Sequence, residues 1–129
     1  FNTVLPPRLS EFVILITARH WPQHYEWGAH ATIAEREGLD ANIIEAVADG
    51  RRPVDMASDE MAVYDFCMEL FRTRGVSDPT YERFVSHFDE IGVIDTISIM
   101  GYYQLLAMVM NTARTPLRTG MEPIPTFPR

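Results

Sequence analysis

The chain has 129 residues, 47% of them hydrophobic, which suits one globular domain and excludes a disordered chain. Its net charge of −7 argues against nucleic acid and anionic membranes as partners, because both are bound by neutralising phosphate groups. None of its basic residues is a lysine, which excludes Schiff-base chemistry and P-loop phosphate binding. The single cysteine, Cys67, excludes an intrachain disulfide, and we expect a reducing, cytoplasmic location.

The first helix is predicted to follow Pro6-Pro7, which cannot lie inside a helix, and to begin at Ser10 as N-cap. Its apolar run is long enough for a strand, but Glu11 as a first-turn charge favours a helix. Arg19 and His20 end this helix, and we expect both side chains to point into the junction with the next one.

The second helix carries the pattern that indicates chemistry. Pro22 suits its first turn and Gly38 its end. Glu26 and His30 are four residues apart and therefore leave the same face, and Gln23 joins them. A carboxylate beside an imidazole can move protons near neutral pH. The alternative is an exposed ion pair, which stabilises a helix by only about 0.3–0.5 kcal/mol.

Two shorter helices are predicted in the middle of the chain. Asp40 caps the first, which stops at Gly50, and Ser58 starts the second, which runs to Gly75. The loop between them holds Arg51-Arg52, which could clamp an anion or simply face solvent or another subunit. Cys67 falls in an apolar helical pattern that indicates a buried structural thiol.

The last third of the chain is the most apolar. A helix begins at residues 77–79 and closes at Gly92, with His87 predicted at its surface or at an interface. Residues 93–112 are too interrupted by polar side chains for a membrane span, so we expect a central or subunit-buried helix. The proline-rich residues 116–129 should form an extended tail that wraps a neighbouring subunit or hangs free.

Leu9-Ser-Glu-Phe-Val-Ile-Leu-Ile-Thr-Ala-Arg-His-Trp21 followed by Tyr25-Glu-Trp-Gly-Ala-His30 resembles the carboxymuconolactone decarboxylase family of alkylhydroperoxidase D-like proteins. Further matches are Ala34-Glu-Arg-Glu-Gly-Leu39, Gly50-Arg-Arg-Pro53, Tyr64-Asp-Phe and Gly101-Tyr-Tyr-Gln-Leu105. The resemblance covers roughly residues 5–115, and we take residues 1–115 as one such domain. It implies an all-α bundle of about six helices, assembly into trimers or hexamers, and a pocket beside the Glu/His helix. It also implies a further helical segment ahead of residue 1.

Peroxidase-type members of that family carry Cys-x-x-Cys followed by x-x-x-His on this helix. When that histidine is aligned with His30, Gln23 and Glu26 occupy the two cysteine positions, so the nucleophile of thiol peroxidase chemistry is missing. The resemblance is therefore to the decarboxylase-like branch. It implies a lyase that removes carbon dioxide from a small carboxylated lactone or unsaturated acid, with no metal and no organic cofactor.

The same resemblance implies roles for individual residues. His30 is expected to be the general acid/base and Glu26 to orient it or exchange its proton, although the two roles could be reversed. The other expected substrate-binding residues share a position near the predicted pocket; they are Arg19, His20, Gln23, Trp27, Arg51, Arg52 and Tyr102.

Other catalytic motifs are missing or weak. The chain has no Gly-x-Ser-x-Gly turn and no His-Glu-x-x-His pair. A metal site built from His24, Glu26 and His30 would need side chains from different helix faces. Two alternatives to the lyase stay open: a non-catalytic oligomeric subunit that binds or scaffolds, and a hydroperoxide reductase that uses Cys67.

Overall fold

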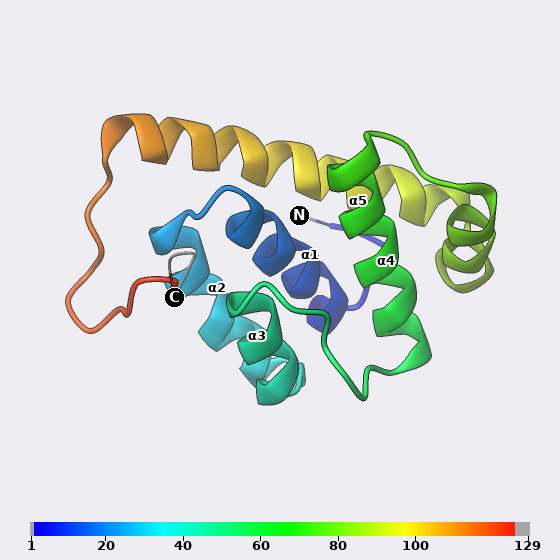
Figure 1. Cartoon of the computed structure of the whole chain (residues 1–129), viewed down its shortest axis with the longest axis horizontal. Helices are drawn as coiled ribbons and strands as arrows, with labels where there is room; N and C mark the ends of the chain where they lie inside the picture. The colour runs from blue at the N-terminus through cyan, green and yellow to red at the C-terminus, as the bar shows by residue number, and fades with distance from the viewer. Residues whose placement is uncertain (1, 126–129) are drawn as a thin grey trace.

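Helices are the only regular structure in residues 2–125, the part of the chain that the computed structural model describes. The prediction of an all-α protein is confirmed. The five helices, shown in Figure 1, are α1 (Pro7–His20), α2 (His24–Arg36), α3 (Ala41–Ala48), α4 (Ser58–Thr73) and α5 (Asp78–Ala113).

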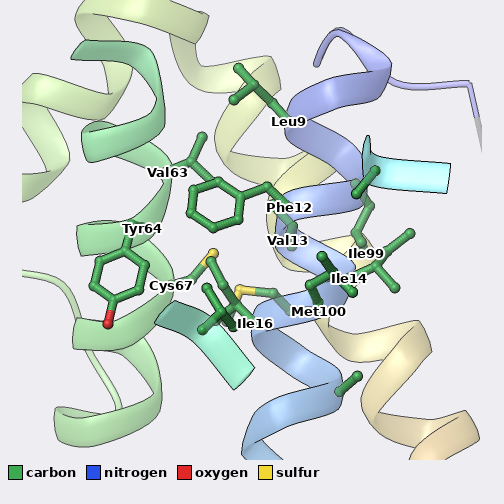
Figure 2. Packing of buried hydrophobic residues seen from close by; sticks show 14 of the residues in the cluster. Leu9, Phe12, Val13, Ile14, Ile16, Val63, Tyr64, Cys67, Ile99 and Met100 are labelled. Carbon is green, nitrogen blue, oxygen red and sulfur yellow. The ribbon is translucent and has the colours of Figure 1, made fainter. Parts of the chain in front are cut away.

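Helix α1 is the centre of the fold. It contacts each of the four other helices, and every residue from Phe12 to Ala18 is buried. Figure 2 shows Phe12 and Ile16 of α1 facing Val63 and Cys67 of α4, with Ile99 of α5 on the other side of α1. The strand-like apolar run thus belongs to a helix that is covered on all sides.

Two alternatives were predicted for residues 93–112: a central helix of the chain is wrong, and burial by another subunit stays a prediction. Helix α5 lies along the outside of α1 and α4 (Figure 1), and it leaves one apolar face in solvent. The exposed large apolar residues of α5 are Tyr81, Ile91, Ile94, Ile97, Tyr102, Leu105, Met108 and Val109. Asp95, in the middle of α5, accepts a hydrogen bond from the Val4 N–H at 2.8 Å and so holds the N-terminal segment against it.

Helix α5 spans both helices that were predicted between residues 77 and 112, and a kink three residues before Gly92 divides it into two helical parts. Counted as one helix, α5 makes five in residues 2–125, so the prediction of about six helices is not confirmed. Helix α5 is interrupted at Asp89, whose φ of 56° and ψ of −178° are not helical. Gly92 does not end a helix; it lies buried just after this break, where a Cβ would collide with the Cβ of Phe88. The glycine therefore serves close packing at the bend rather than termination.

Two helix starts also differ from the prediction. Helix α1 begins at Pro7, with Pro6 as N-cap, so Ser10 and Glu11 lie inside the helix and Glu11 is no first-turn charge. Helix α2 begins at His24, and Pro22 lies in the preceding turn. The predicted signals at residues 38 and 40 are confirmed: Gly38 ends α2 with φ of 101°, and the Asp40 carboxylate accepts from the Asn42 N–H at 2.7 Å.

The C-terminal segment turns back on its own chain after α5 (Figure 1). Met121 packs over Gly28 of α2, and the N–H of the buried Ile124 donates to Nδ1 of His24 at 3.0 Å. Neither predicted alternative, wrapping a neighbour or hanging free, describes residues 116–125. Residues 126–129 lie outside the described part of the chain.

Candidate active site

Glu26 is the most unusual charged residue of the fold. It lies in the first turn of α2, is 3% exposed, and within residues 2–125 neither carboxylate oxygen has a hydrogen-bond partner. Burial raises the pKa of this carboxyl to about 7, although the nearby His30 charge acts in the opposite direction. The group therefore exchanges its proton near neutral pH, which is what a general acid/base needs.

His30 lies one turn further along α2 and is held by α1. Its Nδ1–H donates to Oε2 of Glu11 at 2.7 Å, and both side chains are mostly buried. With Nδ1 engaged in this way, Nε2 is the ring atom that can give or take a proton. The alternative of an exposed Glu26–His30 ion pair is wrong, because Glu26 is buried and the ion pair of His30 is made with Glu11.

Helix α5 contributes a fourth group, the phenol of Tyr103. Its ring meets the His30 ring edge-on, with the centroids 5.2 Å apart and the planes at 82°. Burial first, and then the negative charges of Glu11 and Glu26, raise the pKa of the Tyr103 hydroxyl. We call Glu11, Glu26, His30 and Tyr103 the acid/base cluster; it joins α1, α2 and α5.

Sequence reasoning missed two members of the acid/base cluster. It named Tyr102 as a pocket residue, but the Tyr102 side chain is 44% exposed, while its neighbour Tyr103 faces His30. The spacing carried that signal, since Tyr103 lies four residues from both Ile99 and Ala107, which are buried. For Glu11 the sequence offered no comparable signal, because its partner is on another helix.

Gln23 has a structural part in the site. Its Oε1 accepts from the Glu26 N–H at 2.9 Å, which caps α2, and its Nε2 donates to Oδ1 of Asn111 at 3.2 Å. Asn111 in turn donates to the backbone oxygen of Trp21 at 2.7 Å, so this network fixes the start of α2 against the end of α5. Trp27, expected among the substrate-binding residues, is buried in the core.

The predicted basic substrate-binding residues lie apart from the acid/base cluster. Arg19, His20 and Arg51 line a separate cavity beside α4. Arg52 pairs with Asp65 on the far side of Tyr64, whose ring it also covers at 5.4 Å. The structure therefore groups three of these four residues with one another and not with Glu26 and His30.

The remaining candidate groups are occupied or inaccessible. His24 accepts from the Ile124 N–H through Nδ1. Within residues 2–125 no three His, Cys, Asp or Glu side chains are arranged to hold a metal ion. Cys67 is fully buried, as predicted, and burial raises the pKa of its thiol far above the usual range. His87 is exposed, as predicted.

No family model, no curated protein and no solved structure matches the chain.

Proposed function

We propose that the chain is a lyase that resembles the carboxymuconolactone decarboxylases and uses acid/base chemistry without a cofactor. Its substrate would be a small carboxylated lactone or a related unsaturated acid. The observation that supports this proposal is Glu26, a buried carboxyl with no hydrogen-bond partner in the described residues and a pKa raised to about 7. Such a group is costly for folding, and it is found where a protein needs a proton donor.

The proposed reaction needs a proton donor of this kind. When the bond between the ring carbon and the carboxylate breaks, its electron pair stays on the conjugated lactone as a dienolate, and carbon dioxide leaves. The dienolate is stabilised by a hydrogen-bond donor, a role that we assign to the Tyr103 hydroxyl because its ring lies against His30, and is then protonated on carbon. Neutral Glu26 delivers that proton, and His30, positioned by Glu11, restores it.

The test is carbon dioxide release from a panel of carboxylated butenolides by wild-type protein and Glu26→Gln. Glu35→Gln is the matched control, because Glu35 lies on the same helix but is exposed. We expect Glu26→Gln to lose about 10²–10⁴-fold in turnover and Glu35→Gln to keep the wild-type rate. If all three proteins turned over a substrate of the panel at the same rate, Glu26 would not be the proton donor.

A second candidate is a non-catalytic oligomeric subunit, which the exposed apolar face of α5 favours. We propose that copies of this chain cover that face in a cytoplasmic homo-oligomer, a trimer or hexamer. By length and composition α5 also passes as a membrane span, contrary to the sequence-based prediction, and only 28% of its most apolar stretch is buried. One such helix is weak evidence for a membrane. A hydroperoxide reductase is the least supported candidate, since the thiol of Cys67 is sealed in the core.

A further inference from the structure

A cavity of about 60 Å³ lies between α1, the start of the loop after α3, and α4. Its lining combines apolar side chains with side chains that can donate hydrogen bonds. Its lining residues are Ile16, Val47 and Met68, with Arg19, His20, Gly50, Arg51 and Tyr64. We call it the arginine cavity. In Figure 2, Tyr64 lies near Ile16 with its hydroxyl directed away from the Phe12 ring.

The arginine cavity is separate from the acid/base cluster. The cluster is built from α1, α2 and α5, whereas the cavity takes its lining from α1, the α3–loop segment and α4. On α1, the helix they share, Ile16 and His20 follow Glu11 by five and nine residues, which turns them about 140° and 180° around the helix axis. A ligand in the cavity would therefore not touch Glu26 or His30.

The charge around the arginine cavity opposes that of the whole chain. No acidic side chain is among its lining residues, although the chain carries a net charge of −7. Arg19 is fixed there, since its Nη1 donates to the Ala48 carbonyl at 3.1 Å. Arg52 and Arg72 act on the Tyr64 phenol from outside the cavity, as does Asp65, which pairs with Arg52. The lining itself carries Arg19 and Arg51 and no carboxylate, which favours an anion.

Arg51 has unused donors at the mouth of the cavity. Its only ion pair in residues 2–125 joins Nε to Oδ2 of Asp49 at 3.4 Å. Both Nη groups are therefore available, and a guanidinium presents such groups in a fork that fits a carboxylate. Gly50, whose φ is 72°, makes the turn that brings Arg51 to this position.

Tyr64 supplies a second donor from deeper inside. Tyr64 lines the cavity, and only 5% of the residue is exposed. Its hydroxyl is not one of the enclosed polar atoms that lack a partner, so it is accessible and can donate to a bound carboxylate. His20, whose ring stacks on Phe71 at 4.0 Å, closes the same side of the cavity.

We propose that the arginine cavity binds a small monocarboxylate with an apolar body. The carboxylate pairs with Arg51 at the mouth and accepts a hydrogen bond from Tyr64, and the body contacts Ile16, Val47 and Met68. A neutral molecule of the same shape leaves the Arg51 guanidinium without its partner. This site stands independently of the proposed lyase function.

Benzoate titrated into the full chain, followed by two-dimensional NMR of the backbone amides, tests the proposal. We expect saturable shifts around residues 50–51 and 64 with a Kd of roughly 1 mM, and at least about tenfold weaker binding of benzamide. Arg51→Gln should weaken benzoate binding at least about tenfold, and Tyr64→Phe by roughly threefold to tenfold. Because Arg51 is half exposed and buries no unpaired group, Arg51→Gln should fold normally.

Arg52→Gln is the matched control, because it removes the same charge from the neighbouring residue, which does not line the cavity. It should change the Kd less than about twofold, since a screened surface charge contributes little. Glu26→Gln should bind benzoate like wild type, which keeps this result apart from the lyase question. Absence of saturable binding to wild type, equal binding of benzamide, or an unchanged Kd in Arg51→Gln would each overturn the proposal.

Discussion

Nδ1 of His30 lies 2.7 Å from Oε2 of Glu11, and this contact joins α2 to α1 where both side chains are mostly buried. Glu26, one helical turn before His30, is left with no hydrogen-bond partner in residues 2–125. The two carboxyl groups near the imidazole are therefore unequal: Glu11 holds the ring, and Glu26 is available to exchange a proton. Each half of this arrangement has a measurable consequence.

Glu26→Gln should stabilise the protein at high pH. The carboxyl has a pKa of about 7 in the folded state against 4.5 without burial. Between these pH values the folded state binds more protons than the unfolded state, so the free energy of unfolding falls as pH rises through this window. The loss by pH 8 is on the order of 3 kcal/mol. The neutral amide does not titrate, so the variant avoids this loss.

Urea unfolding of wild type and Glu26→Gln at pH 5 and pH 8 measures the effect. The variant should gain on wild type by roughly 2–3 kcal/mol between the two pH values, with Glu35→Gln as the exposed control. A stability difference that is the same at both pH values would show that Glu26 is already ionised at no cost in the folded protein.

The local chemistry of the sequence predicts much of this fold. The end of α2 at Gly38 and the start of α3 at Asp40 are set by residues that contact only the adjoining helical turn. The shared face of Glu26 and His30 follows from their spacing. The burial of Cys67 follows from the apolar pattern around it. Each of these features depends on neighbours in the chain, which is why pattern reasoning reaches it.

The features that the sequence did not predict depend on which helices meet. The Glu11–His30 contact requires α1 to pack beside α2, and the orphan state of Glu26 follows from that pairing. Apolar content alone predicted residues 93–112 as the central helix, whereas α1 has that position. Helix α5 is as apolar as α1 but keeps one face in solvent. The sequence predicted the break in α5 approximately, since Gly92 was taken as a helix end and the non-helical residue is Asp89, three positions earlier.

Glu11→Gln should loosen His30 and destabilise the fold. The amide cannot provide the negative charge that the Nδ1–H donates to, and this bond is largely buried, so we expect a loss of about 1–3 kcal/mol. A double-mutant cycle with His30→Gln, measured by urea unfolding, isolates the pair and should give a coupling energy of about 1–2 kcal/mol. Additive effects within about 0.3 kcal/mol would mean that the two side chains do not interact in solution.

Cys67 should resist alkylation in the native protein. It is fully buried, and burial raises the pKa of its thiol, so little thiolate exists and none of it is accessible. Iodoacetamide should label the thiol only after unfolding, as followed by mass spectrometry. Cys67→Ser should leave turnover nearly intact but cost about 1–3 kcal/mol of stability, because it buries a hydroxyl in an apolar site. Rapid native labelling that inactivates wild type, but not the serine variant, would support a reactive cysteine instead.

The apolar face of α5 should be an interface between copies of the chain. Light scattering after size exclusion should show an oligomer at micromolar concentration, with more than roughly 1,200 Å² buried in each contact. Leu105→Glu places a charge on this face and should give a folded monomer. Val54→Glu is the control, because Val54 is 70% exposed but lies outside α5, and it should leave the oligomer unchanged. A wild-type protein that stays monomeric would exclude this interface.

The acid/base cluster should act as one unit in turnover. Glu26→Gln and His30→Gln each keep approximate shape while removing a titrating group, so each should cost about 10²–10⁴-fold in carbon dioxide release. If Glu26 delivers the proton and His30 restores it, losing either one stops the same transfer. The double variant should then be little slower than the worse single variant, because groups that act together are not additive. Costs that multiply in the double variant would instead assign the two residues to separate steps, and full activity in both single variants would leave the cluster with a structural role only.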